Sequence, residues 1–546
     1  MKKKYNYIWP TIIAMALAIG IFIGGKLHFS DSPEKLFGTN SKKDKLNRLI
    51  DFIDYEYVDD IDTDSIVDVT VNNILDKLDP HSVYIPKDEM KRVAESMKGD
   101  FVGIGIRFYR VQDTIAVMRT VEDGPSYLHG IQAGDRLLMA DSDTLYGPDK
   151  DDDKIIALLK GKKGTPVKLK IYRKKTDSIF TVNLKRDRVP LKSVDAYYML
   201  TDDIGYIKVN RFAESTYNEF KEALSYLQRK GAEKLALDLR DNPGGYLGIA
   251  EKMADEFLKK NKLILFTKNK KGEIKKTFAT SKGSFENKPI YVLINERSAS
   301  ASEIIAGALQ DNDIGTIVGR RSFGKGLVQR EMELGDGSAV RLTVSRYYTP
   351  TGRSIQKSYK NGNKDYYKTF TDRYKNGELI SVDSIKVADS LKFTTPKGKV
   401  VYGGGGIIPD VFVPIETNGK ELLESIENIY GYFSRFIFSH LEEDRNRYDD
   451  YTEEMFLSEF RADDILFEDF INFLEQRVVL KPLNLHYYDL EDKIKLTLKA
   501  TLAEQLFTPN LQAKIKSVDD AMLRKVMELE GYKTVKDGMG NINVNN

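Results

Sequence analysis

The sequence predicts a multidomain α/β protein, and three observations lead to this prediction. Strands alternate with helices from residue 189 to about 415, which is typical of a layered α/β domain. The segment 100–188 is rich in short strands with alternating apolar residues. Residues 419–546 carry apolar side chains at helical spacing, which predicts a helical carboxy-terminal domain.

The composition indicates a folded chain with no strong charge bias. Its 546 residues suggest three or four domains of ~150 residues each. With 41% hydrophobic and 30% charged residues it is globular rather than disordered. The formal net charge of +2 shows no excess of basic residues of the kind that nucleic-acid-binding proteins carry. The chain has no cysteine, which excludes a disulfide framework, a Cys-based zinc site and a Cys nucleophile.

The first 29 residues predict a signal anchor. Three lysines precede an uncharged run from Tyr5 to Gly25, close to the ~20 residues that span a bilayer as a helix. The lysines predict that the amino terminus stays in the cytoplasm and that the rest is exported. A cleaved signal peptide is the alternative. Residues 30–86 follow as a polar linker and an amphipathic helical segment that ends in "DPHSVYIP", where we expect His81 to be a packed or capping side chain.

Residues 87–188 contain strands, two helices and turns in an order that resembles a PDZ domain. The stretch "GPSYLHGIQAGDRLL" is its most specific part. The resemblance implies that the loop "VGIGI" binds peptide, through Val102, Gly103, Ile104, Gly105 and Ile106. Turn glycines let backbone N–H groups converge into a nest that can hold a terminal carboxylate. A strand with a glycine bulge is the alternative interpretation.

The stretch "ERSASASEIIAGALQD" can be interpreted in two ways. Ser300 and Glu303 fit a capping box, and Ser298 and Ser302 can also cap a helix. On this stretch alone a helix cap is the favoured interpretation. However, Ser300 lies between a strand that ends at Asn295 and a helix, where backbone N–H groups can stabilise an oxyanion.

A second loop could contribute to the same oxyanion site. In "DLRDNPGGYLG", Gly244 and Gly245 follow a strand and precede a helix. Such a glycine pair permits a turn that points N–H groups into a cleft. The alternative is a plain connection between strand and helix.

A nucleophilic serine also needs a base, and Lys325 is the candidate. It lies between two glycines, and a desolvated lysine can act as a general base. Gln329 could orient its amine. The segment "GRRSFGK" also matches the first seven positions of a phosphate-binding loop, but the eighth is Gly326 and a strand pattern follows, so we reject nucleotide binding. A glycine-flanked surface lysine is the remaining alternative.

Five motifs in order, "LDLRDNPGG", "SASASEIIAGALQD", "GRRSFGKGLVQ", "YYTPTGRSIQ" and "GGIIPDV", resemble the carboxy-terminal processing peptidases. The resemblance spans roughly residues 45–415 and implies a serine endopeptidase with a crotonase-like α/β core and an inserted PDZ domain. It implies that Ser300 is the nucleophile, that Lys325 is the base and that Gln329 supports Lys325. The oxyanion hole would be the Ala301 N–H and a glycine of the "NPGG" loop, either Gly244 or Gly245.

The resulting domain prediction is an anchor (1–29), a linker with a helical segment (30–86), a PDZ domain (87–188), a protease domain (189–418) and a helical domain (419–546). We expect the PDZ domain to capture free, apolar carboxy termini of exported proteins in the bacterial cell envelope, at the inner membrane or in the periplasm. The mechanism needs no metal or organic cofactor. The helical domain is expected to have a packing or assembly role, in which it binds an adaptor or forms a homo-oligomer. One alternative is a PDZ scaffold without catalytic activity. The other is a crotonase-like acyl-CoA enzyme, because that fold also builds oxyanion holes from glycine turns.

Overall fold

The computed structural model describes residues 15, 41–111, 113–415, 420–477, 490–536 and 542–545. They form two compact units that divide between Leu75 and Asp76. Apart from Met15, the predicted anchor lies outside the described residues, so it and the envelope localisation stay predictions. Among the residues that were described, no helix has the length and apolarity needed to cross a membrane. The first unit contains helices α2 (Ser41–Glu56) and α3 (Thr63–Leu75).

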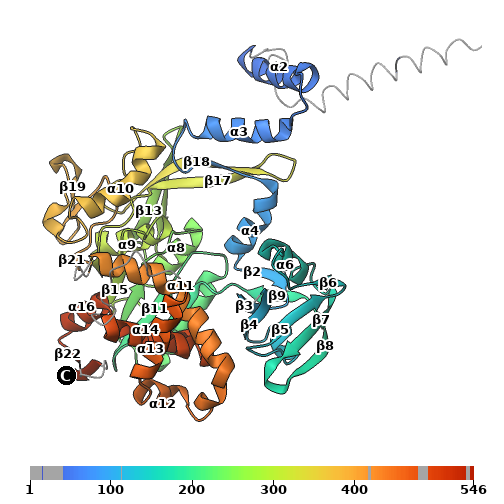
Figure 1. Cartoon of the computed structure of the whole chain (residues 1–546). Helices are drawn as coiled ribbons and strands as arrows, with labels where there is room; N and C mark the ends of the chain where they lie inside the picture. The colour runs from blue at the N-terminus through green and yellow to red at the C-terminus, as the bar shows by residue number, and fades with distance from the viewer. Residues whose placement is uncertain are drawn as a thin grey trace, which may run out of the picture. The chain divides into compact units, whose positions relative to one another are not determined.

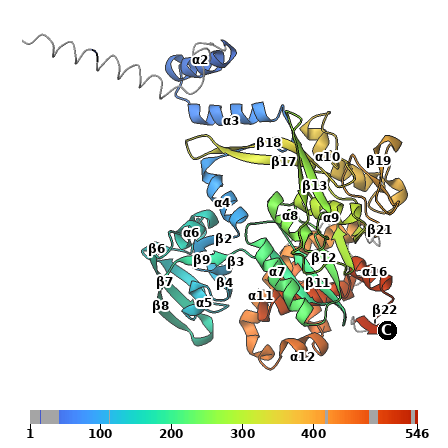
Figure 2. The same cartoon turned by 180° about the vertical axis from the view of Figure 1, so that it is seen from behind.

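A six-stranded sheet with helices on both faces forms the core of the second unit (Figure 1, Figure 2). The strands of the sheet are β10 (Val194–Met199), β11 (Ile204–Val209), β12 (Lys234–Asp238), β15 (Ile290–Ile294), β16 (Gly315–Gly319) and β21 (Val411–Phe412). The helices α7 (Thr216–Arg229), α8 (Leu247–Asp255) and α9 (Ala301–Asp311) pack against it. The strand order is β10-β11-β12-β15-β16-β21, parallel except for β10. Every residue of β15 is buried, as expected for a central parallel strand covered on both faces. The predicted α/β layering is confirmed.

A second, antiparallel sheet carries further residues of the candidate site. It consists of β1 (Val83–Ile85), β13 (Leu263–Asn269), β14 (Ile274–Phe278), β17 (Leu327–Glu333) and β18 (Ala339–Tyr348). Since β17 directly follows the "GRRSFGK" segment, the strand that argued against a phosphate-binding loop is confirmed. The segment between β18 and the "GGIIPDV" motif contains α10 (Asn363–Lys375), η3 (Val382–Ser384), η4 (Asp389–Leu391), β19 (Lys392–Thr394) and β20 (Val400–Tyr402).

The PDZ-like region is β-rich, as predicted. Its elements are α4 (Lys87–Lys98), β2 (Asp100–Gly103), β3 (Ile106–Val111), β4 (Thr114–Thr120), α5 (Pro125–Leu128), β5 (Arg136–Ala140), β6 (Asp143–Thr144), α6 (Asp152–Leu159), β7 (Pro166–Arg173), η2 (Lys174–Thr176), β8 (Ser178–Lys185) and β9 (Asp187–Pro190). The main strand path is β3-β4-β5-β7-β8, and β2 pairs with β9. Strand β3 therefore lies at an edge of its sheet.

The carboxy-terminal region is helical for most of its described length. It contains α11 (Lys420–Asp444), η5 (Arg445–Tyr448), α12 (Glu453–Ser458), α13 (Asp464–Glu475), α14 (Glu491–Leu506), α15 (Pro509–Ser517), α16 (Ala521–Leu529), β22 (Lys533–Lys536) and β23 (Ile542–Asn545). The prediction of a helical domain to residue 546 is wrong at the end, where β22 pairs with β23.

The last helix also belongs with the protease core rather than with a separate domain. On α16, Met522, Leu523 and Val526 are buried against the sheet face that carries Tyr206 and Leu293. A parallel sheet must be covered on both faces, and this apolar stripe supplies the second cover.

Candidate active site

The three motif loops meet at one edge of the central sheet. Strands β12, β15 and β16 are consecutive parallel neighbours, so their carboxyl ends lie side by side. The loop after β12 carries Gly244 and Gly245, the loop after β15 carries Ser300, and the loop after β16 carries Lys325. The fold thus brings together the residues that the sequence motifs singled out.

Ser300 has an uncommon backbone conformation. Its φ of 55° and ψ of −112° give a non-glycine residue a positive φ, directly before α9. Gly244 lies against it, because a Cβ on Gly244 would be 2.8 Å from Ser300 Cβ and 3.0 Å from Ala301 N. Strain of this kind persists where surrounding structure enforces it, which is common at functional sites.

A buried carboxylate connects the Ser300 loop to the Lys325 loop. Glu303 accepts from Ser300 N–H at 2.9 Å and Lys325 N–H at 2.9 Å through one oxygen. Its other oxygen accepts from Gly324 N–H at 2.7 Å and the Ser322 hydroxyl at 2.5 Å. Burial raises the pKa of Glu303. Since all four partners are donors, the site accommodates the ionised carboxylate, which accepts only.

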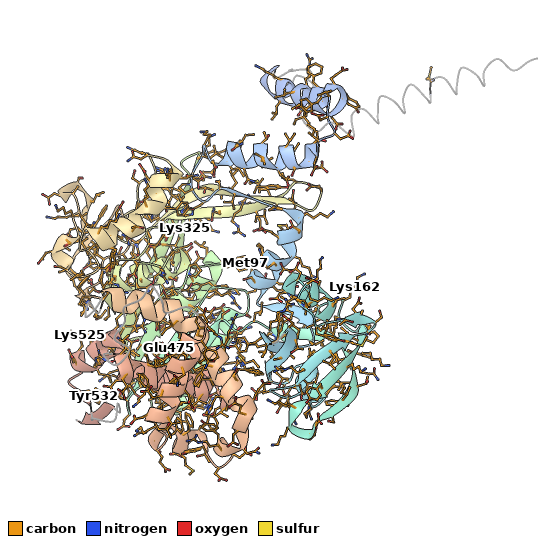
Figure 3. The ribbon with its side chains drawn as sticks, in the orientation of Figure 1. Met97, Lys162, Lys325, Glu475, Lys525 and Tyr532 are labelled. Atoms are coloured by element: carbon orange, nitrogen blue, oxygen red, sulfur yellow. The ribbon has the colours of Figure 1, made fainter. Side chains whose placement is uncertain are left out.

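Lys325, labelled in Figure 3, has an amine suited to proton transfer. Burial, with a smaller effect from the charge of Arg341, lowers the pKa of Lys325 to about 8. Its Nζ donates to Gln329 Oε1 at 2.9 Å. Gln329 in turn donates through Nε2 to the His81 carbonyl oxygen, which fixes the orientation of the amide. The expected pairing of Gln329 with the lysine amine is confirmed.

The two glycines of the "NPGG" loop differ in what their N–H groups do. Gly244 N–H donates to Asn242 Oδ1 at 2.8 Å, so it is already engaged. Among the described residues, the N–H groups of Gly245 and Ala301 have no hydrogen-bond acceptor. A Cβ on Gly245 would lie 2.3 Å from the Phe212 carbonyl oxygen, so only glycine fits this close approach.

The neighbouring serines stabilise the loops, as expected. The buried Ser298 hydroxyl donates to the Leu239 carbonyl at 2.8 Å. The buried Ser302 hydroxyl donates to the Asn242 carbonyl at 3.0 Å. Both bonds tie the Ser300 stretch to the loop after β12.

Sequence reasoning missed several groups around the site. The buried Tyr347 hydroxyl lies 2.8 Å from the Lys325 carbonyl oxygen and 3.2 Å from that of Ser300. Lys357 has its Nζ 3.9 Å from the Phe323 ring centre and 4.0 Å from that of Tyr366, and burial lowers its pKa to about 7. The signal was present for these residues, since "YYTPTGRSIQK" contains Tyr347 and Lys357, but only tertiary contacts reveal their partners.

His81 is a packed side chain, as expected. Its Nε2 lies 2.8 Å from the Tyr366 hydroxyl, and burial lowers its pKa to about 4. The side chain therefore stays neutral at ordinary pH. Its backbone carbonyl, rather than its ring, contacts Gln329 of the site.

The predicted peptide-binding loop presents free backbone donors. The carbonyls of Ile104 and Gly105 accept from Ser126 N–H and Val121 N–H, both at 2.9 Å. Within the described parts of the chain, the N–H groups of Ile104 and Gly105 have no acceptor. The positive φ of 77° at Gly105 turns the chain here. The loop leads into edge strand β3, so donors and a free strand edge lie next to each other.

Comparisons with known proteins agree with this arrangement. The model of peptidase family S41 matches residues 203–363, the PDZ domain model matches residues 102–184, and a family of unknown function matches residues 428–508. A carboxy-terminal-processing protease of Bartonella bacilliformis is 36% identical over 328 residues, which cover 58% of this chain and 75% of the relative. The carboxy-terminal processing protease CtpA of Bacillus subtilis is 33% identical over 360 residues, covering 65% and 76%.

The chain belongs to the carboxy-terminal processing protease family. It is a serine-type peptidase with a PDZ domain. A solved structure titled as a photosystem II D1 carboxy-terminal processing protease is also similar, at 23% identity and a TM-score of 0.36, covering 69% of this chain and 88% of that one. Membership of the carboxy-terminal processing protease family disfavours a silent scaffold and an acyl-CoA enzyme.

Proposed function

We propose that this protein binds the carboxy-terminal tails of other proteins through its PDZ domain and cleaves them with Ser300 as nucleophile and Lys325 as base. The observation that carries the proposal is the Glu303 carboxylate, which joins the strained backbone of Ser300 to the loop of a lysine with a depressed pKa. Structural capping alone needs neither a buried lysine nor a connection to it.

The proposed reaction proceeds through an acyl-enzyme. Neutral Lys325 takes the proton of the Ser300 hydroxyl as Oγ attacks the scissile carbonyl carbon. The negative charge on the carbonyl oxygen is stabilised by Ala301 N–H and Gly245 N–H, which have no acceptor among the described residues. The Lys325 ammonium then protonates the leaving amine. Water, deprotonated by Lys325, attacks the ester, releases the new carboxylate and restores the Ser300 hydroxyl.

Gln329 acts as the positioning residue for the base. A lysine side chain has four rotatable bonds, and without a partner its amine samples many positions. The Gln329 carbonyl oxygen accepts one Nζ–H at 2.9 Å and leaves the lone pair of the neutral amine for the serine proton.

Tail capture follows from the donors of the PDZ loop. The N–H groups of Ile104 and Gly105 supply the nest for a terminal carboxylate, and a tail can pair with the edge of β3 as an added strand. Apolar residues in this region, including Ile106 and Phe108, favour an apolar tail end.

The test compares one unfolded protein carrying either an apolar or a charged tail. The full chain is expected to cleave the apolar-tailed protein with a KM at least tenfold lower, because an adapted pocket discriminates by ~1–3 kcal/mol. Ser300→Ala is expected to cleave neither. Initial rates followed by gel or mass spectrometry measure this. Equal KM values for both tails would contradict tail recognition, and cleavage by Ser300→Ala would contradict the nucleophile.

A further inference from the structure

Helix α11 has a second contact face beside the one that fills its own core. Phe433, Ile437 and Leu441 belong to the core of the helical region. Phe438 lies outside that core, yet its side chain is only 3% exposed. It is buried instead against Ala116 of the PDZ domain and the PDZ residues that surround it. Strands β3 to β5 and helix α11 are labelled in Figure 1.

The PDZ surface that receives Phe438 is the outer face of its sheet. Ala116 and Met118 on β4 are 0% and 6% exposed, and Tyr109 and Val111 of β3 pack beside them. The Tyr109 and Phe438 rings meet edge to face at 5.8 Å. Without α11 these apolar side chains would form an exposed patch on a sheet face, which soluble domains rarely leave uncovered.

An ion pair and a further hydrogen bond link the two regions beside this apolar centre. Arg136 of β5 donates to Glu442 of α11 at 2.8 Å, and its guanidinium lies 5.7 Å from the Phe438 ring centre. Lys175 donates to Asn446 Oδ1 at 3.0 Å. Phe438 and Glu442 are four residues apart, so they share one stripe of the helix. Such charge complementarity fixes the register of a contact more than its strength.

The ion pair of this contact is not fully satisfied. Arg136 Nη1 and Glu442 Oε1 are buried, and in the described portion of the chain neither has a hydrogen-bond partner. Unpaired buried polar atoms cost free energy, so the contact is weaker than a complete bidentate pair would make it. This favours a contact that can open and close.

The same helical region forms part of the wall of a cavity between the PDZ domain and the protease core. This cavity of about 2110 Å³ extends from Ile106 and Arg107 of β3 to Asp241 and Arg297, which flank the two oxyanion loops. Residues 504–509 of the helical region form part of its wall. Strand β3 thus has one face against the helical region, its free edge at the proposed tail site and its first residues in the cavity.

We propose that the region matched by the family of unknown function is the docking partner of the PDZ domain. By holding the outer face of β3 and β4, it keeps the tail-binding edge beside the cavity that reaches Asp241 and Arg297 of the protease core. This inference rests on the proposed tail-binding function. Docking and tail binding both use β3, and if docking strengthens tail binding, linkage requires that a bound tail strengthens docking by the same factor.

The first experiment measures docking without catalysis or tail. The chain has no cysteine, so Lys175→Cys with Asn446→Cys gives two unique thiols for a short bismaleimide cross-linker. Arg136→Glu is expected to lower the cross-linking rate roughly tenfold, as expected when the docked form falls to about a tenth of the molecules. Adding Glu442→Arg restores opposite charges and is expected to restore the rate. Lys162→Glu, an exposed PDZ residue labelled in Figure 3, is the matched control and is expected to change nothing.

The second experiment measures tail affinity in a Ser300→Ala background by anisotropy of a fluorescent peptide with an apolar end. Arg136→Glu and Phe438→Ala are each expected to weaken binding roughly tenfold. The Arg136→Glu/Glu442→Arg pair is expected to recover it, which a merely unfolded variant would not do. Equal affinity in the parent and in Arg136→Glu, despite lost cross-linking, overturns this inference alone. A parent that binds no tail peptide overturns the tail-binding function and this inference with it, while cross-linking still reports whether the regions dock.

Discussion

Replacing Lys325 by alanine is expected to lower kcat/KM for an apolar-tailed protein by roughly 10³-fold, because a positioned general base contributes about 10²- to 10⁴-fold. The amine donates to Gln329, whereas the contact of Lys325 with Glu303 is made by its backbone N–H, so removal of the amine leaves the loop contacts of Glu303 in place. We therefore expect normal folding by circular dichroism. Steady-state cleavage by the full chain measures the loss.

Lys357→Met is the matched control for this variant. Lys357 also has a depressed pKa, but its Nζ lies against Phe323 and Tyr366 and donates to the Tyr366 carbonyl at 3.1 Å. It is expected to retain far more activity than Lys325→Ala. If Lys357→Met is the inactive variant and Lys325→Ala cleaves normally, the base is wrongly assigned.

The pH dependence follows from the same lysine. The active form is the neutral amine, and burial lowers its pKa from 10.5 to about 8. Therefore kcat/KM is expected to rise tenfold per pH unit below about 8 and to level off above it. The inflection is expected to persist in Lys357→Met. An inflection near 4, the pKa of His81, would instead point to that ring as the base.

Replacing Glu303 by glutamine is expected to lower kcat/KM at least 100-fold although Glu303 touches no substrate. Two of its four donor partners would face an amide NH₂ group, which cannot accept from them. The unfolding free energy is expected to fall by about 3–6 kcal/mol, since two hydrogen bonds to a charged group are lost and each contributes ~1.5–3 kcal/mol. Denaturant titration and steady-state kinetics measure these losses.

A pH profile separates positioning from general destabilisation in Glu303→Gln. The negative charge of Glu303 raises the pKa of Lys325 against the effect of burial. Neutralising it is expected to move the inflection of kcat/KM below 8. A structural lesion alone would lower activity without moving the inflection. Retention of both the inflection near 8 and most of the activity would contradict the role of Glu303.

Much of this site could be predicted from sequence because it lies in loops after predicted strands. Once β12, β15 and β16 are parallel neighbours, the loops with Gly245, Ser300 and Lys325 must meet. Partner identity could not be predicted in the same way. Glu303 fits a capping box by spacing, but its bonds to Gly324 and Lys325 depend on tertiary packing.

The carboxy-terminal region illustrates the same limit. Helical periodicity predicted its helices, but periodicity reports only that a face is apolar and not what covers it. The stripe of α16 covers the central sheet, and Phe438 of α11 packs against the PDZ domain. Likewise, the choice between Gly244 and Gly245 depended on Asn242, whose side chain engages one of the two N–H groups.

Labelling with a serine-reactive phosphonate tests the central claim most directly. Trypsin releases residues 298–320, which contain Ser298, Ser300 and Ser302, so fragmentation must assign the adduct to one serine. We expect a stoichiometric adduct on Ser300, none on its neighbours, and labelling slowed roughly 10³-fold in Lys325→Ala. An adduct on another serine, or a Ser300→Ala chain that still cleaves its substrate, would contradict the account.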